Sequence, residues 1–179
     1  MASQLGTINR PLILGIDPGL HGAVAVLDTS ATIYGKPPRI EVIYDMPTYK
    51  TETKARKQGY FEHINAHELA FLLDPYARDV RVAILEAPNA MPEQGLSSTF
   101  RFGHACGQIH GVLAGFYIPI VPVTPGSWKA YFGLSQDKTQ SMVRAREFFP
   151  ESAEYWRLKK HNDRAEAALM AMFGFQFLK

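Results

Sequence analysis

The feature that most constrains the fold is a pair of short apolar runs that each end in an acidic residue. The first run is Leu12–Ile16, followed by Asp17 and the turn-forming pair Pro18-Gly19. The second run is Val80–Leu85, followed by Glu86. Runs of this length with almost no polar interruption are typical of strands that are buried on both faces by helices. They predict the centre of an α/β domain.

The other elements complete this picture. Further strands are predicted over Gly22–Leu27, Arg39–Tyr44 and Tyr117–Val123. Helices are predicted after Asn65, from Ser98, around Trp128, from Asp137 to Phe149 and from His161 to the C-terminus. Three successive strands followed by alternating helices and strands indicate an α/β domain with a mixed five-stranded sheet flanked by helices. A length of 179 residues is expected to form one domain over residues 1–179.

Two segments are expected to lie outside this framework. Residues 1–10 are expected to be flexible. Residues 47–62 are polar, aperiodic and rich in lysine and arginine, which predicts a mobile basic loop.

The helix predicted from Ser98 carries glycine at every fourth position, at Gly103, Gly107, Gly111 and Gly115. Each glycine costs about 1 kcal/mol of helix propensity relative to alanine, so such a ridge favours close packing of another backbone on it. That backbone could belong to a second copy of the chain or to the sheet of the same chain. A helix interrupted by its glycines is the alternative.

Composition excludes several classes of protein. The single Cys106 excludes a disulfide framework, and no apolar run is long enough to span a membrane. The N-terminus lacks the apolar core of a signal peptide. We therefore expect a cytoplasmic protein of a bacterial or phage-infected cell, or of an organelle if a transit segment has been removed. The net charge of +2 argues against a uniformly cationic surface for nucleic acid, although not against local patches.

Four acidic residues occupy the ends of predicted elements. Asp17 and Glu86 end the two apolar strands, and Asp163 and Glu166 lie three residues apart in the last helix. Each has an ordinary structural explanation, such as the Asp-Pro-Gly turn or a helix-capping box. Together they indicate a shared site, because ligands of α/β sheets bind at the carboxyl ends of strands and i, i+3 positions share a helix face.

A cluster of carboxylates is stabilised by hard divalent cations with oxygen ligands, of which Mg²⁺ and Mn²⁺ are the natural choices. Two such ions can bracket a phosphodiester, one activating water and the other stabilising the leaving oxygen. The four acids are therefore the candidate catalytic and metal-binding residues, with two Mg²⁺ as the expected cofactor and Mn²⁺ as a substitute.

The ordered motifs resemble the RuvC-type Holliday junction resolvases. Gly15–Leu20 with Gly22–Val26 is similar to the opening of that family, Leu85-Glu86 to its second acid, and Asp163–Glu166 to its C-terminal acidic pair. The resemblance covers roughly residues 10–176. Its closest match is to plant chloroplast and phage-type resolvases, through Trp128-Lys129, Phe132–Leu134, Lys138, Phe149-Pro150 and Lys159–Ala167.

The resemblance implies an RNase H-like fold, a homodimer, and Mg²⁺-dependent nicking of two opposed strands of four-way junction DNA. The chain departs from bacterial RuvC in having Glu166 where that branch has Asp, and this longer side chain can still bind a metal but shifts its position. Its basic loop from Tyr49 to Gly59 is also more extended than in bacterial RuvC.

Further residues are candidates for contacts with nucleic acid. Met91, in the loop after the second acid, is a candidate wedge between bases or an ordinary loop residue. Lys129 and Lys138 match basic positions near the scissile region, with solvated surface lysines as the alternative. The remaining candidates are Lys159 and Lys160 as phosphate contacts, and His161 as a metal ligand, a proton shuttle or a helix-start residue.

The leading hypothesis is a junction-resolving endonuclease that cuts phosphodiesters by two-metal hydrolysis. A related RNase H-like nuclease that acts on RNA or on other branched DNA is the alternative. A phosphate-binding ATPase or sugar kinase also opens with a strand that ends in Asp and Gly, but it needs a second phosphate loop and usually a longer chain. A non-catalytic junction-binding protein would be expected to lack one of the acids.

Overall fold

The computed structural model describes residues 10–53, 59–87, 95–135 and 138–178. The strands are β1 (Leu12–Ile16), β2 (Ala23–Asp28), β3 (Arg39–Asp45), β4 (Thr48–Thr53), β5 (Gly59–Ile64), β6 (Val80–Glu86) and β7 (Ile120–Val123). The α-helices are α1 (Ala66–Leu73), α2 (Leu96–Gly115), α3 (Pro125–Tyr131), α4 (Lys138–Phe148) and α5 (Asn162–Gly174). Short 3-10 helices are η1 (Ser30–Tyr34), η2 (Pro150–Trp156), η3 (Lys159–His161) and η4 (Phe175–Leu178).

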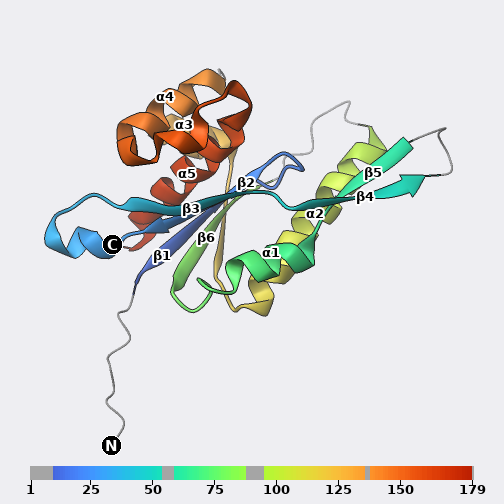
Figure 1. The fold of residues 1–179 in the computed structure, drawn as a ribbon, viewed down its shortest axis with the longest axis horizontal. Coiled ribbons are helices and arrows are strands. Elements are labelled where there is room, and N and C mark those ends of the chain that lie inside the picture. Colours follow the sequence, from blue (N-terminus) through green and yellow to red (C-terminus); the bar gives the residue numbers. More distant parts are fainter. Residues whose placement is uncertain (1–9, 54–58, 88–94, 136–137, 179) are drawn as a thin grey trace, which may run out of the picture.

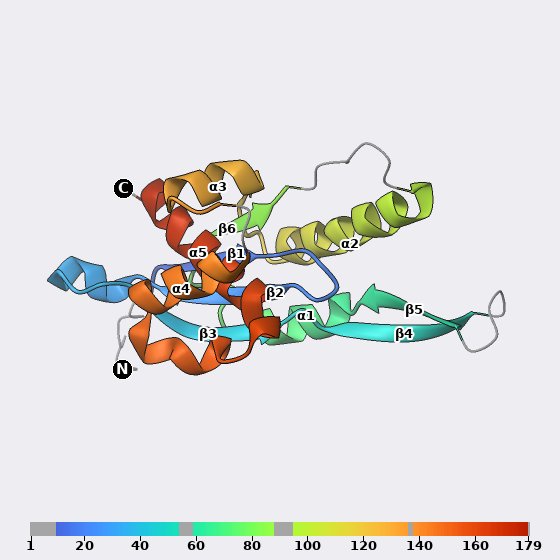
Figure 2. The same ribbon diagram turned by 90° about the horizontal axis from the view of Figure 1, so that it is seen from above.

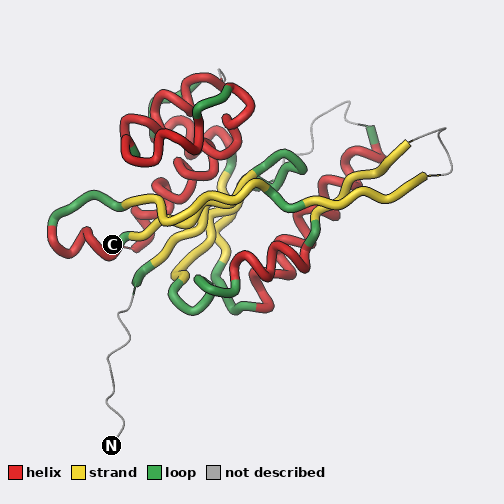
Figure 3. Tube along the Cα trace, viewed as in Figure 1, coloured by secondary structure: helices red, strands yellow, loops and turns green. Residues whose placement is uncertain are grey.

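The main sheet has five strands in the order β3-β2-β1-β6-β7. Strands β1, β2 and β3 form an antiparallel meander, whereas β6 is parallel to β1 and β7 is parallel to β6. The predicted mixed five-stranded sheet is therefore confirmed. Helices cover both of its faces (Figures 1 and 3).

Two hydrophobic cores lie on opposite faces of the sheet. Alternate residues of β1 point to opposite faces, so Ile13 packs in one core and Leu12, Leu14 and Ile16 pack in the other. The first core is closed by α3, α4, α5 and η2, and the second by α1 and α2. All five residues of β1 are buried, as the uninterrupted apolar run predicts for a central strand.

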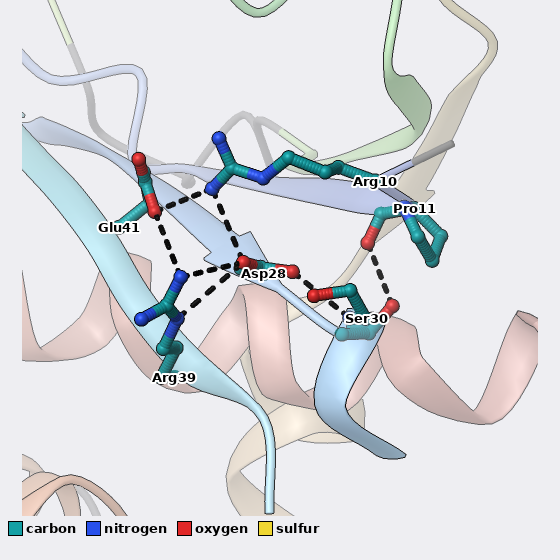
Figure 4. A network of polar contacts seen from close by, with 7 residues as sticks. Arg10, Pro11, Asp28, Ser30, Arg39 and Glu41 are labelled. Carbon is teal, nitrogen blue, oxygen red and sulfur yellow. Dashed lines mark hydrogen bonds and ion pairs between the residues drawn. The ribbon is translucent and has the colours of Figure 1, made fainter. Parts of the chain in front are cut away.

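An ion network ties together the end of the sheet at which β1 begins (Figure 4). Asp28 is 1% exposed and lies opposite Leu12 in the β1–β2 register. Its carboxylate accepts hydrogen bonds from Arg10 at 3.1 Å and Arg39 at 3.2 Å, and from the backbone N–H of Ser30 at 2.9 Å. This pairing accounts for a carboxylate inside the core.

The segment predicted as a mobile basic loop over residues 47–62 contains two paired strands. Strands β4 and β5 form a separate antiparallel sheet with Thr48 opposite Ile64, and residues 54–58 lie outside the described part of the chain. Tyr49 stacks on His63 across the pair, with ring centroids 5.3 Å apart. Residues 49–52 and 60–61 are exposed and Ile64 is the one described residue of the hairpin that is buried, so its sequence lacks the apolar–polar alternation from which a strand is usually recognised.

Helix α2 and the hairpin extend together from one end of the sheet (Figures 1 and 2). The Arg101 guanidinium of α2 lies 5.5 Å from the ring centroid of Phe61, and Gln108 donates to the carbonyl of Ile64 at 3.2 Å. The helix begins at Leu96, close to the predicted start at Ser98, and continues through all four glycines. The alternative of an interrupted helix is therefore wrong.

The glycine ridge of α2, formed by Gly103, Gly107, Gly111 and Gly115, faces away from the described part of the chain. A Cβ atom added at any of the four would meet no described heavy atom within 4 Å. The ridge thus does not pack on the sheet of its own chain. Phe100, which is 77% exposed, and Leu96, which is 91% exposed, lie toward the N-terminal end of the same helix.

No helix in the described part of the chain is long and apolar enough to cross a membrane. The predicted segment 1–10 lies outside that part except for Arg10.

Candidate metal centre

The parallel pairing of β1 and β6 brings two of the acids together. Ile16 lies opposite Leu85 in the register, so Asp17 and Glu86 follow at the same edge of the sheet. Both belong to the carboxyl ends of central strands, where α/β sheets collect ligands.

Helix α5 carries the other two acids to this edge because it packs very closely on β1. A Cβ atom on Gly15 would lie 2.0 Å from the carbonyl oxygen of Ala167, so only glycine permits this approach. Asp163 and Glu166 project from the beginning of the helix, three residues apart. One glycine in β1 therefore helps to place half of the site.

Three of the four acids converge. Asp17, Asp163 and Glu166 each offer a carboxylate oxygen within 4.8 Å of the others. Glu86 lies outside this group, although its charge acts on Asp17. We call the three converging residues the acid triad.

The turn after β1 orients Asp17. Its Oδ1 accepts a hydrogen bond from the backbone N–H of Gly19 at 3.0 Å. Gly22 closes the turn, and a Cβ atom there would lie 2.2 Å from the carbonyl oxygen of Asp17. The sequence left two explanations for Asp17, a residue of the Asp-Pro-Gly turn or a member of a shared site. In the structure Asp17 is both.

Helix α3 contacts both Glu86 and the acid triad through two adjacent side chains. The indole N–H of Trp128 donates to Oε1 of Glu86 at 3.0 Å. Lys129 Nζ lies 3.1 Å from Oε1 of Glu166, and the two side chains are only 12% and 8% exposed. The buried Ser141 of α4 donates to the same oxygen at 3.1 Å.

The electrostatics of the site disfavour bare carboxylates. Burial, opposed by the hydrogen bond from Gly19 and reinforced by the charges of the other acids, raises the pKa of Asp17 to about 7. Burial also raises the pKa of Glu86, against the effect of the Trp128 hydrogen bond. A proton or a cation is therefore needed to relieve the repulsion at neutral pH.

The donor set fits a hard divalent cation. All of its ligand atoms are carboxylate oxygens, three of them are already gathered within 4.8 Å, and burial limits their hydration. The single positive charge of Lys129, which pairs with Glu166, is too small to balance four carboxylates.

The other predicted contact residues lie in several parts of the chain. Lys159 and Lys160 are exposed on η3, just before α5, and Lys138 is the first residue of α4. His161 is partly buried and lies outside the acid triad, and burial together with nearby Arg164 and Lys160 lowers its pKa. Met91 lies outside the described residues.

Two contacts of the acids were not anticipated. Trp128 is part of the Trp128-Lys129 motif identified in the sequence, but no spacing rule predicts that its indole contacts Glu86, 42 residues earlier. Ser141 reaches Glu166 only because α4 packs on α5, and it carries no sequence signal of its own.

The comparisons with known proteins are structural. No family model matches the chain, and no curated protein matches it. Thermus thermophilus RuvC matches with 16% identity and a TM-score of 0.59, over 93% of this chain and 96% of that chain. The T. thermophilus RuvC complex with a Holliday junction substrate matches with 14% identity and a TM-score of 0.58, over the same shares.

A viral protein has a similar fold. The fowlpox virus Holliday junction resolvase matches with 14% identity and a TM-score of 0.54, over 94% of this chain and 99% of that chain. Together these matches show that the chain has the RuvC variant of the RNase H-like fold, as the sequence motifs imply.

Proposed function

We propose that this protein is a metal-dependent endonuclease that resolves four-way DNA junctions by paired, symmetric nicks. The observation that carries the proposal is the acid triad, with Glu86 beside it, at the carboxyl edge of a RuvC-like sheet. One of the similar structures is RuvC in complex with a Holliday junction substrate, and another is the fowlpox virus Holliday junction resolvase.

Asp17, Glu86, Asp163 and Glu166 would hold two Mg²⁺, with Mn²⁺ as a substitute. Such cations, when bound, activate the attacking water and stabilise the leaving oxygen, so that hydrolysis leaves 5′-phosphate and 3′-hydroxyl ends. Three of these residues, the acid triad, lie close together in the structure. Asp17, whose pKa is about 7, has to lose its remaining proton on binding, which makes cation affinity rise with pH.

Lys129 contributes a positive charge to the acid triad through its ion pair with Glu166. In the ground state it balances part of the charge of Glu166. Near a phosphodiester, the same ammonium would offset negative charge that develops in the transition state.

The exposed Lys159 and Lys160 support contacts with the DNA backbone close to the acids. They immediately precede the helix that carries Asp163 and Glu166, so a phosphate bound there would lie near the site. The sequence resemblance supports Lys138 and Met91 as further contacts with the DNA, and His161, next to Lys160 in the sequence, is another candidate contact.

A homodimer would supply the two active sites that opposed nicks require, and the glycine ridge of α2 is the proposed contact between copies. Its four glycines are open to a second backbone, and Leu96 and Phe100 expose apolar surface on the same helix. A Cβ atom at any of these glycines would meet no heavy atom of the described residues within 4 Å, which favours a second copy of the chain over the sheet of the same chain as the partner of the ridge.

We also propose that the protein is most similar to plant chloroplast and phage-type resolvases, because its Trp128-Lys129 and Lys159–Ala167 segments resemble theirs. We expect the protein to act in the cytoplasm of a bacterial or phage-infected cell.

The experiment that tests the proposal compares wild type with Asp17→Asn on a labelled four-way junction in Mg²⁺. Asp17→Asn should bind the junction and fail to cut it, whereas Asp74→Asn, at the exposed end of α1, should bind and cut normally. Retained cleavage by Asp17→Asn would refute the metal assignment. A fork, a linear duplex and an RNA–DNA hybrid measured in parallel test the substrate class, and faster cutting of any of these would favour the alternative nuclease.

A further inference from the structure

The protein has two tryptophans, Trp128 and Trp156, and both are 0% exposed. Their indole N–H groups have different surroundings. The N–H of Trp128 donates to Oε1 of Glu86 at 3.0 Å, whereas that of Trp156 has no hydrogen-bond partner in the part of the chain that the structure describes. Packing alone therefore does not account for the contact that Trp128 makes.

The backbone around Trp128 is fixed from both sides. Strand β7 pairs with β6 so that Val123 lies opposite Glu86, and α3 starts two residues later at Pro125. The side chain of Thr124 accepts a hydrogen bond from the N–H of Ser127 and caps the helix. The pairing of β7 with β6 and the capped start of α3 therefore fix the position of the indole next to Glu86.

The contact bears on how Glu86 can act. Oε1 of Glu86 is already hydrogen-bonded to the indole, and the residue lies outside the acid triad. An indole N–H can only donate, so it holds the ionised carboxylate and cannot compete with it as a metal ligand. One carboxylate oxygen is left for other partners.

The same indole also contacts the charge beside the triad. Lys129 Nζ lies 5.1 Å from the Trp128 ring centroid and 3.1 Å from Oε1 of Glu166. The ring therefore supports the ammonium that pairs with Glu166 while its N–H holds Glu86.

We propose that Trp128 is a positioning residue for the metal centre: its indole N–H holds one oxygen of Glu86 and leaves the other as a ligand at a fixed place beside the acid triad. This role rests on the proposed metal-dependent function. Groups that orient metal ligands typically change metal affinity by about 10- to 100-fold when they are removed.

The first test uses Trp128 as its own reporter. In Trp156→Phe, Trp128 is the only tryptophan left, and Mg²⁺ added without DNA should change its emission in a saturable way. In Trp128→Phe, the remaining Trp156 should give no such change. A Trp128 emission that is unaffected by Mg²⁺, while calorimetry detects binding to the same protein, would overturn the proposal.

The second test measures Mg²⁺ affinity by calorimetry, again without DNA. Trp128→Phe keeps an aromatic ring and removes the donor, and it should weaken binding about 10-fold or more. Trp156→Phe is the matched control, since it makes the same change at an equally buried site, and it should bind as wild type does. Thermal unfolding of each variant identifies a loss of fold. If Trp128→Phe does not fold, the emission test on Trp156→Phe, which keeps Trp128, still decides.

The two levels of failure are distinguishable. If wild type neither binds Mg²⁺ nor cuts a junction, the proposed function fails and the role of Trp128 fails with it. If wild type binds Mg²⁺ and cuts, but Trp128→Phe has the same Mg²⁺ affinity, the role of Trp128 alone is refuted.

Discussion

Lys129 of α3 and Glu166 of α5 form a buried ion pair in which the ammonium lies 3.1 Å from Oε1 of the carboxylate. It joins the helix that follows β7 to the helix that supplies half of the acids. Because Glu166 is also part of the acid triad, the pair links the stability of the fold to the charge state of the site.

Replacing Lys129 with methionine should lower the free energy of unfolding in the absence of divalent cations. Removing one partner of a buried ion pair leaves an uncompensated charge and typically costs about 3 to 5 kcal/mol. Mg²⁺ should recover more stability in this variant than in wild type, because it supplies the missing positive charge. Urea unfolding with and without Mg²⁺ measures both effects. Equal Mg²⁺ stabilisation of variant and wild type would contradict the account, and Lys36→Met, at an exposed lysine, is the control.

The pH dependence of stability should carry the signature of Asp17. Its pKa is raised from 3.8 to about 7 in the folded state, so the folded protein binds the proton more tightly than the unfolded chain. The contribution of Asp17 to stability is therefore complete below pH 3.8 and is lost as the pH rises to about 7. At about 1.4 kcal/mol per pH unit, the loss is at most about 4 kcal/mol.

Asp17→Asn should remove this fall in metal-free stability between pH 4 and 7, and saturating Mg²⁺ should reduce it in wild type. Denaturant unfolding at a series of pH values is the measurement. A slope that is unchanged in Asp17→Asn would assign the titration to another group.

The strands of the main sheet and the convergence of Asp17, Asp163 and Glu166 were predictable because both follow from local patterns. Apolar runs that end in Asp17 and Glu86 mark central strands, and the i, i+3 spacing of Asp163 and Glu166 marks one helix face. The strands β4 and β5 were not predictable in this way, because most of their residues are exposed or half-buried and only Ile64, at the end of β5, belongs to a core. The direction of the α2 glycine ridge and the contact of Trp128 with Glu86 depend on how distant elements pack.

The Asp28 network at the opposite end of β1 should affect stability without affecting the site (Figure 4). Burial by itself would raise the pKa of Asp28, but hydrogen bonds from Ser30, Arg10 and Arg39 outweigh it and lower the pKa from 3.8 to about 2. This stabilisation is present above pH 3.8 and is lost as the pH falls through about 2.

Asp28→Asn should therefore reduce the free energy of unfolding at pH 7 by about 2 to 3 kcal/mol. The cleavage rate per folded molecule should stay the same, because Asp28 lies opposite Leu12, at the start of β1, whereas Asp17 follows its end. Urea unfolding and a cleavage assay on one preparation check this. A large loss of cleavage in fully folded Asp28→Asn would contradict the separation of the two ends.

The glycine ridge of α2 gives a prediction about assembly. Gly107→Leu should convert a dimer to a monomer, because its side chain would occupy the space offered to a second backbone. The fold of the single chain should be retained, since a Cβ atom at Gly107 meets nothing described within 4 Å and leucine has the higher helix propensity. Light scattering after size exclusion measures the mass. A dimer of unchanged affinity would place the contact between copies elsewhere.

The most direct test of the central claim is to map nicks on a synthetic four-way junction with each strand labelled in turn. With Mg²⁺, wild type should cut two opposed strands at symmetric positions and leave 5′-phosphate ends, and removal of the metal by a chelator should abolish both nicks. Cutting that persists in the presence of the chelator would contradict the assignment of the four acids to junction resolution. So would a Mg²⁺-dependent nuclease activity that leaves the junction intact and degrades another nucleic acid.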